Sequence, residues 1–152
     1  MKNKKYLNHP SLFNCKICVV GLGYVGLPLA IEFSKVKKSI KTGVELDRKV
    51  IGLDLNKKRI DELNNGIDST MEIEENDLKN LKKIEFTSDV KSAISSDVFI
   101  IAVPTPINKK KEPDLDFLRG ATEAVGDILA CRLNETLPVI IFESTVYPGT
   151  TE

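Results

Sequence analysis

Short apolar runs alternate along the chain with stretches in which apolar residues recur at helical spacing. Runs rich in β-branched residues are typical of inner strands of a parallel sheet, because helices cover both faces of such a sheet. The pattern predicts strands at 17–20, 49–54, 84–87, 97–103 and 138–142. It predicts helices at 24–33, 57–63, 74–81, 90–94 and 115–129, the second of them ended by Gly66. This strand–helix alternation predicts an α/β fold built on a parallel sheet.

A glycine-rich turn joins the first strand to the first helix. Gly21, Gly23 and Gly26 form a Gly-x-Gly-x-x-Gly sequence between them. In this context the first glycine permits the turn, the second lets a pyrophosphate approach the backbone, and the third lets helix and strand pack closely. The free N–H groups and the helix dipole favour an anion at this point. The order predicts a Rossmann-like, doubly wound sheet with helices on both faces, and a dinucleotide as its ligand.

An acidic residue is expected after the second strand, where it accepts hydrogen bonds from the adenine ribose. Asp54 closes the apolar run at 49–54 and precedes a helical pattern, but it lies 28 positions after Gly26. The usual spacing is roughly 20. Glu45 and Asp47 lie nearer that spacing and are rivals. We favour Asp54, which would repel a ribose 2′-phosphate and so favours NAD over NADP. It would also suit the N-cap of the next helix.

An inserted segment explains the long spacing. Residues 35–48 are rich in lysine and contain Gly43. We expect a longer helix end followed by a solvated surface loop, and we assign this segment no function.

Composition indicates one ordinary domain. The chain has 152 residues, 41% hydrophobic and 29% charged, and 22 basic residues balance 22 acidic ones. We expect a polar N-terminal arm over 1–14 and a single domain over 15–152. The absence of a basic excess argues against nucleic acid or an anionic membrane as partner. The chain has neither a signal-peptide pattern nor a run of membrane-spanning length, so we expect a cytoplasmic location.

The cysteines do not predict a metal site. Cys15 and Cys18 have metal-ligand spacing, but positions three apart on a strand face opposite sides. Cys131 and His9 are the only other thiol and the only imidazole. We therefore expect buried, reduced cysteines and no bound metal.

Three segments should meet where the strands of the sheet end. They are the glycine turn, residues 104–106 (Pro-Thr-Pro) and residues 143–149 (Glu-Ser-Thr-Val-Tyr-Pro-Gly). Ligands bind open parallel sheets at this edge. The last two segments would then flank the nicotinamide of a bound cofactor, although proline and glycine also occur at strand exits as plain turn residues.

Together these motifs resemble the nucleotide-sugar 6-dehydrogenases. The residues that carry the resemblance are Gly-Leu-Gly-Tyr-Val-Gly-Leu-Pro at 21–28, Val-Ile-Gly-Leu-Asp at 50–54 with Asn-Lys-Lys-Arg-Ile at 56–60, Ala-Val-Pro-Thr-Pro at 102–106, and the segment 143–149. Only 1–14 and 35–48 depart from the family pattern. The stretch 65–72 (Asn-Gly-Ile-Asp-Ser-Thr-Met-Glu), together with Tyr147, resembles the branch acting on UDP-N-acetylglucosamine or UDP-N-acetylgalactosamine.

The resemblance implies a role for individual residues. The N–H groups of Tyr24 and Val25 would hold the pyrophosphate. Asp54 would bind the adenine ribose and Arg59 the adenosine end. Toward the other end of the cofactor, the family pattern implies Val103, Pro104 and Thr105 beside the nicotinamide ribose and Thr145 as a residue that helps to position a water.

The resemblance also implies a reaction that this chain cannot complete. The family oxidises the sugar C6 alcohol to a carboxylate in two hydride transfers, through an aldehyde and a cysteine-bound thioester, which supplies uronates for surface polysaccharides. Its catalytic cysteine, lysine, asparagine and aspartate lie beyond the motif that ends this chain, and Cys15, Cys18 and Cys131 match none of them. We expect an inactive cofactor half that stops before the last strand of a complete sheet.

The complete protein should take a UDP-sugar and form a homodimer or larger assembly. A hydroxyacid or hydroxyacyl-CoA dehydrogenase fragment, and a stand-alone NAD-binding or interaction module, remain alternatives.

Overall fold

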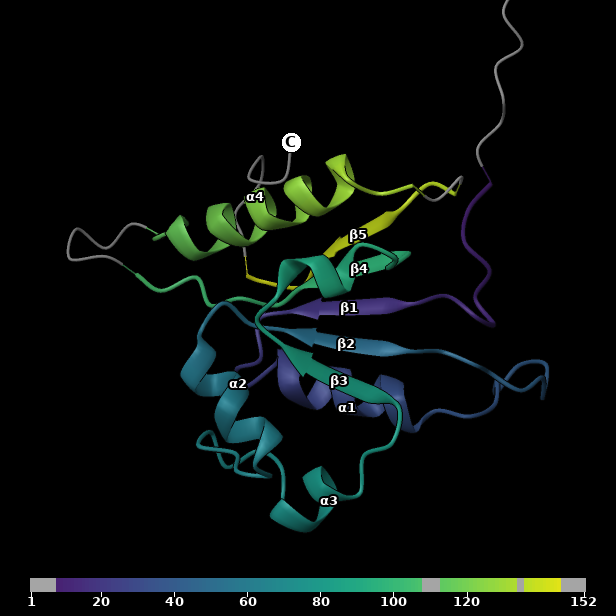
Figure 1. Cartoon of the computed structure of the whole chain (residues 1–152), viewed down its shortest axis with the longest axis horizontal. Helices are drawn as coiled ribbons and strands as arrows, with labels where there is room; N and C mark the ends of the chain where they lie inside the picture. The colour runs from purple at the N-terminus through teal and green to yellow at the C-terminus, as the bar shows by residue number, and fades with distance from the viewer. Residues whose placement is uncertain (1–7, 108–112, 134–135, 146–152) are drawn as a thin grey trace, which may run out of the picture.

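A five-stranded parallel sheet forms the centre of the computed structural model, which describes residues 8–107, 113–133 and 136–145. The strands lie in the order β3-β2-β1-β4-β5 (Figure 1). They are β1 (Ile17–Val20), β2 (Val50–Leu53), β3 (Ile84–Thr87), β4 (Val98–Ile101) and β5 (Val139–Phe142). All five predicted strands are present, three of them shorter than the apolar runs that predicted them.

Helices cover both faces of this sheet, as the doubly wound fold requires (Figure 1). They are α1 (Gly26–Lys35), α2 (Lys57–Asn64), α3 (Glu75–Lys79), the 3₁₀ helix η1 (Val90–Ala93) and α4 (Asp116–Ala130). The first three pack on one face, and η1 and α4 pack on the other. Within the described ranges, no helix is long and apolar enough to cross a membrane.

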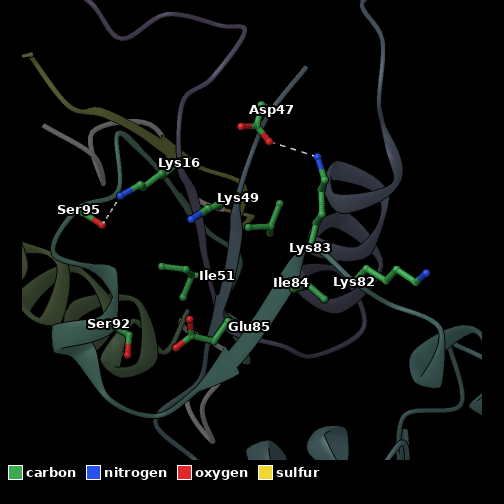
Figure 2. Close-up of a pocket in the computed structure, with 11 residues that line it drawn as sticks. Lys16, Asp47, Lys49, Ile51, Lys82, Lys83, Ile84, Glu85, Ser92 and Ser95 are labelled. Carbon is green, nitrogen blue, oxygen red and sulfur yellow. Dashed lines mark hydrogen bonds and ion pairs between the residues drawn. The ribbon is translucent and has the colours of Figure 1, made fainter. Parts of the chain in front are cut away.

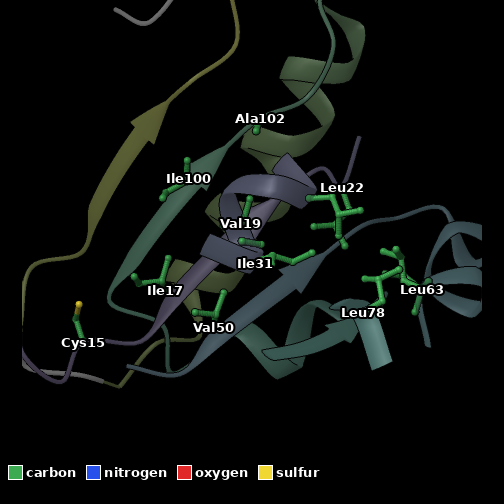
Figure 3. Packing of buried hydrophobic residues seen from close by; sticks show 13 residues of the cluster. Cys15, Ile17, Val19, Leu22, Ile31, Val50, Leu63, Leu78, Ile100 and Ala102 are labelled. Carbon is green, nitrogen blue, oxygen red and sulfur yellow. The ribbon is translucent and has the colours of Figure 1, made fainter. Parts of the chain in front are cut away.

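The core has two halves because successive side chains of a strand point to opposite faces. Ile17 and Val19 of β1 pack on the α1 face, where Ile31 is fully buried (Figure 3). Cys18 and Val20 pack on the other face, against the buried side of α4. Every residue of β1 is therefore buried, which explains why its sequence reads as a continuous apolar run.

Helix ends differ from the sequence prediction more than strand positions do. α1 begins at Gly26 rather than at residue 24, because the glycine turn extends through Val25. α3 ends at Lys79, where the Asn80 N–H bonds to the carbonyl of Asp77 three residues back. The predicted end of α2 is confirmed: Gly66 has a φ of +75°, and the Ile67 N–H bonds to the carbonyl of Glu62. This is the usual glycine-terminated helix end.

The inserted segment is a folded-back loop and not an extension of the helix. α1 ends at Lys35, and an antiparallel bridge then joins Lys38 to Glu45. Gly43, with a φ of +68°, lies within the turn that this bridge closes. The expected longer helix end is therefore wrong, whereas the expected surface loop is correct. The loop projects from the amino edge of the sheet, away from the glycine turn (Figure 1).

Candidate functional site

The order of the strands creates a crevice at the carboxyl edge of the sheet. From β1 the chain builds outward through β2 and β3, and then crosses back to form β4 and β5 on the other side. Connections therefore leave the carboxyl ends of β1 and β4 in opposite directions, and ligands of open α/β sheets bind at such a point. The glycine turn follows β1, and Val103 follows β4, at this crevice.

Gly21 and Gly26 are required by the backbone itself. Gly21 has a φ of +91°, and a Cβ there would lie 2.8 Å from the Val103 side chain. A Cβ on Gly26 would collide with the Gly21 carbonyl oxygen. Only glycine has neither a Cβ nor a strong preference for negative φ. These two glycines therefore serve the tight packing of helix, turn and strand.

Gly23 differs from both, because a Cβ at this position would meet no atom within 4 Å. Its φ is not in the left-handed region, so the fold itself does not demand glycine here. In the described part of the chain, no acceptor is found for the amide N–H groups of Tyr24 and Val25, beside the start of α1. Open space beside free amides at a helix N-terminus is the arrangement that receives phosphate.

Asp54 lies directly after β2 and is tied to the glycine turn. One carboxylate oxygen accepts the Leu22 N–H at 2.9 Å, and the other accepts the Asn56 N–H at 2.9 Å. Glu45 and Asp47 precede β2 and lie at the opposite edge of the sheet. The structure thus places Asp54, and neither rival, beside the glycine turn.

The N-cap of α2 is Asn56, so the alternative capping role considered for Asp54 is wrong. The Asn56 side-chain oxygen accepts the N–H groups of Lys58 and Arg59. Asp54 lies two residues before this N-cap, too early to reach the open N–H groups of the first helical turn, and it orders the Asn56 backbone instead.

Arg59 is buried, and its guanidinium is bound within the protein. Its Nε donates to the Leu22 carbonyl at 2.9 Å, and its Nη2 donates to Asp68 at 2.7 Å. Burial alone would raise the pKa of Asp68, but hydrogen bonds from Thr70 and Arg59 outweigh that effect and lower the pKa to about 2. Asp68 is therefore a carboxylate, and Arg59 has an ionic partner inside the fold.

Hydrogen bonds tie the exits of β4 and β5 together. The Ser144 hydroxyl donates to the Val103 carbonyl at 2.6 Å, and the Thr105 hydroxyl donates to the Thr145 carbonyl at 2.8 Å. The two predicted segments therefore meet. The expected contribution of Tyr147 falls outside the described residues.

Two cavities open on either side of the glycine turn and share Gly23, Val103 and Pro104 as a common wall. The first, of about 450 Å³, we call the β2-side cavity; the second, of about 330 Å³, we call the β5-side cavity. The β2-side cavity is also lined by Gly21, Leu22, Asp54, Leu55, Arg59, Thr70, Asp116, Phe117 and Gly120. The β5-side cavity is also lined by Tyr24, Val25, Ala102, Thr105, Glu143, Ser144 and Thr145. All predicted site residues except Gly26 line one or both cavities. Gly26 lies behind the cavities.

The sequence analysis did not identify several residues that line the cavities. Leu55 and Phe117 line the β2-side cavity although each residue is more than half exposed, at 58% and 56%. Phe117 does not lie on the apolar face of α4. An aromatic residue at such a position indicates a role outside the core, and this feature could have been read from the sequence. The Ser144 contact had no local signal, because its partner lies 41 residues away in the chain.

A third cavity, of about 410 Å³, lies at the amino edge of the sheet (Figure 2). Lys16, Lys49 and Lys83, each just before a strand, contribute to its walls. Asp47 pairs with Lys83 at 3.2 Å, and Glu85 adds a second carboxylate, so the lysine charge is partly balanced. This cavity lacks the glycine turn and lies at the edge opposite the crevice.

Comparison with known proteins agrees with this geometry. Residues 15–152 match the model of the UDP-glucose/GDP-mannose dehydrogenase family, NAD binding domain. The chain is 45% identical over 137 residues to the UDP-N-acetyl-D-glucosamine 6-dehydrogenase of Salmonella typhi, covering 90% of this chain and 28% of that protein. It is 47% identical over 139 residues to Protein CapL of Staphylococcus aureus, covering 91% and 29%.

A solved structure shows the same fold. The GDP-mannose dehydrogenase of Pseudomonas aeruginosa, solved as a ternary complex, superposes with a TM-score of 0.73 at 31% identity, over 89% of this chain and 29% of that one. The chain thus spans less than a third of the length of these relatives. The chain belongs to the UDP-glucose/GDP-mannose dehydrogenase family and corresponds to its NAD-binding domain.

Proposed function

We propose that NAD(H) binds across the two cavities with its pyrophosphate against Gly23. The observation that carries this proposal is the open space at Gly23, where the fold has no need of glycine. The adenosine half would occupy the β2-side cavity and the nicotinamide half the β5-side cavity. Bound NAD⁺ supplies a hydride acceptor; this chain's residues hold and orient it.

The site residues have distinct roles in this proposal. The amides of Tyr24 and Val25 donate to the pyrophosphate. The Asp54 carboxylate has lone pairs beyond the two that already accept N–H groups, and these accept from the adenine ribose hydroxyls. Val103, Pro104 and Thr105 flank the nicotinamide ribose.

Replacement of Asp54 tests the ribose assignment. The parent chain should bind NADH more tightly than NADPH, because the carboxylate repels a 2′-phosphate. In Asp54→Ala the dissociation constant for NADH should rise about tenfold or more, the loss expected for hydrogen bonds to a charged acceptor. Calorimetric titration of both cofactors measures both quantities.

Glu45→Ala is the matched control, since this exposed carboxylate lies before β2. It should leave both dissociation constants unchanged. Equal affinity of the parent for NADH and NADPH, or a loss of NADH binding in Glu45→Ala instead, would contradict the assignment.

For the complete protein we propose oxidation of the C6 alcohol of a UDP-N-acetylhexosamine, either glucosamine or galactosamine, to a uronate. Two NAD⁺ and one water would be consumed per alcohol, giving the carboxylate, two NADH and three protons. The similarity to the 6-dehydrogenase of Salmonella typhi supports this substrate class. Thr145, on the wall of the β5-side cavity, would help to position the water. We place the complete protein in the cytoplasm, as a homodimer or larger assembly that supplies a surface polysaccharide.

The cysteines of this chain are poorly placed for the thioester step. Burial raises the pKa of the Cys18 thiol to about 12, and burial also raises the pKa of Cys15. Cys131 lies after α4, and no cysteine of the described residues lines either cavity. A nucleophilic cysteine needs a lowered pKa beside the reacting carbon.

We therefore expect no NADH formation from any UDP-sugar by this chain, and turnover by a protein extended to the length of its relatives. The extended protein should oxidise UDP-N-acetylhexosamines faster than UDP-glucose. NADH absorbance measures both. Turnover by the short chain would contradict the missing-nucleophile argument, and a preference for UDP-glucose would contradict the substrate class. An extended protein that binds NADH but oxidises no UDP-sugar would favour a binding module.

A further inference from the structure

The loop that follows α2 is folded around one buried carboxylate. The side chain of Asp68 has no exposed surface, and it accepts five hydrogen bonds. The donors are the Thr70 N–H and hydroxyl at 3.0 and 2.6 Å, the Glu72 N–H at 2.9 Å, the Ile73 N–H at 3.0 Å and Arg59 Nη2 at 2.7 Å. A carboxylate has about four lone-pair positions. Asp68 therefore has no capacity left for a ligand.

Arg59 links this loop to the glycine turn. Its guanidinium reaches Asp68 from one side, while its Nε donates to the Leu22 carbonyl at 2.9 Å from the other. The Leu22 N–H in turn donates to Asp54 at 2.9 Å. Both backbone polar groups of Leu22 are thus held by charged side chains, each more than 30 residues away in the sequence. The next residue is Gly23, which with Val103 and Pro104 forms the common wall of the two cavities.

We infer that Asp68 and Arg59 are positioning residues of the dinucleotide site, acting through the Leu22 carbonyl to hold Gly23 in place. Asp68 fixes the guanidinium, the guanidinium fixes the Leu22 carbonyl, and the peptide that leads into Gly23 is held before a ligand arrives. Holding a site in its bound geometry removes an ordering cost from binding. The inference rests on the proposed function.

This inference assigns the 65–72 stretch a role in the cofactor end of the protein. The resemblance associated this stretch with the choice of sugar, yet Asp68 is saturated within the fold. Thr70 donates its hydroxyl to Asp68 and also lines the β2-side cavity. The stretch therefore shapes the wall around the adenosine half, and Asp68 does not contact a sugar.

Arg59→Lys separates positioning from folding. Lysine keeps a positive charge for Asp68 but lacks the planar fork that reaches Asp68 and the Leu22 carbonyl together. We expect a folded chain by circular dichroism, and a dissociation constant for NADH about tenfold higher, the size expected for one charge-assisted hydrogen bond. In ¹H–¹⁵N spectra of the free chain, the Leu22 and Gly23 amide resonances should move. A role in folding alone would lower the urea midpoint without changing NADH affinity in the folded state.

Asp68→Asn should produce the same two changes, because it removes the negative charge at 2.7 Å from the guanidinium and leaves the more distant Glu62, at 3.9 Å, as ionic partner. Asp61→Asn is the matched control: it removes a carboxylate from the exposed side of α2, the helix that carries Arg59, and within the described residues that side chain has no hydrogen bond. The control should bind NADH like the parent and leave both resonances in place. If Asp68→Asn does not fold, Arg59→Lys decides alone.

The inference is overturned if Arg59→Lys binds NADH within twofold of the parent, whether or not the resonances move. It is also overturned if NADH affinity falls while the Leu22 and Gly23 resonances stay fixed, because the loss of affinity then does not act through the Leu22 carbonyl. A parent chain that binds no dinucleotide would overturn the proposed function first, and this inference with it.

Discussion

Gly23→Val should abolish NADH binding while leaving the chain folded. The space at this position is open, so a valine Cβ meets no protein atom within 4 Å, and the φ of Gly23 needs no special residue. The branched side chain would instead occupy the wall that the two cavities share, where the pyrophosphate is proposed to lie. We expect the dissociation constant to rise at least about a hundredfold, because a steric collision cannot be relieved by a rotamer change next to the backbone. Calorimetric titration measures the loss, and circular dichroism with urea unfolding verifies the fold.

Gly126→Val is the matched control for this substitution. Gly126 lies in α4, is exposed, and also has no atom within 4 Å of a built Cβ, but it lines neither cavity. The same change there should leave NADH affinity intact. Unchanged binding in Gly23→Val would mean that the glycine turn serves packing alone.

Gly26→Ala should have a different effect: it should lower the stability of the fold, whereas Gly23→Val should abolish NADH binding. A Cβ at Gly26 would collide with the Gly21 carbonyl oxygen, and it would also lie 3.3 Å from the Ala102 side chain. Backbone atoms cannot rotate away, so β1 and α1 would have to separate. We expect the free energy of unfolding to fall by about 3 kcal/mol or more, within the range of severe overpacking. The urea midpoint and slope measure this change.

Gly126→Ala is the control for stability. Alanine is favoured over glycine within a helix by roughly 0.5–1 kcal/mol, so this variant should be slightly more stable than the parent. A Gly26→Ala chain as stable as the parent would mean that helix and strand can separate at little cost. The contrast between Gly23 and Gly26 would then lose its physical basis.

These two glycines show how one motif combines two constraints. Gly26 lies behind the turn, where helix and strand are in contact, whereas Gly23 lies on its open side. Gly23 lines both cavities and Gly26 lines neither, so of these two glycines a ligand in the cavities can contact only Gly23. The amides of Tyr24 and Val25, which have no acceptor among the described residues, lie beside the N-terminus of α1 and next to that open side.

The local sequence pattern was sufficient to predict the strands, the glycine turn and the position of Asp54. A continuous apolar run such as 17–20 predicts a strand covered on both faces, and the structure buries all four residues. Asp54 could be identified because it ends such a run, and parallel strands bring their carboxyl ends to one edge. The predicted ends of helices were less accurate than the predicted strands. α1 begins at Gly26, because the glycine turn extends further than the apolar spacing indicates.

The sequence by itself determined the fold class and the glycine turn, since these depend on periodicity and on residues close together in the chain. The family was indicated by the resemblance of motifs at 21–28, 50–60, 102–106 and 143–149. The tertiary structure alone decided that Arg59 is held by Asp68 and the Leu22 carbonyl, that Asn56 rather than Asp54 caps α2, and that Leu55 and Phe117 face one cavity. The Asn56 cap is a local contact that apolar spacing does not reveal. The Leu22–Arg59 contact and the cavity wall that Leu55 shares with Phe117 bring together residues that are distant in sequence, 37 positions apart for Leu22 and Arg59. Such contacts depend on how the elements pack, which local periodicity does not encode.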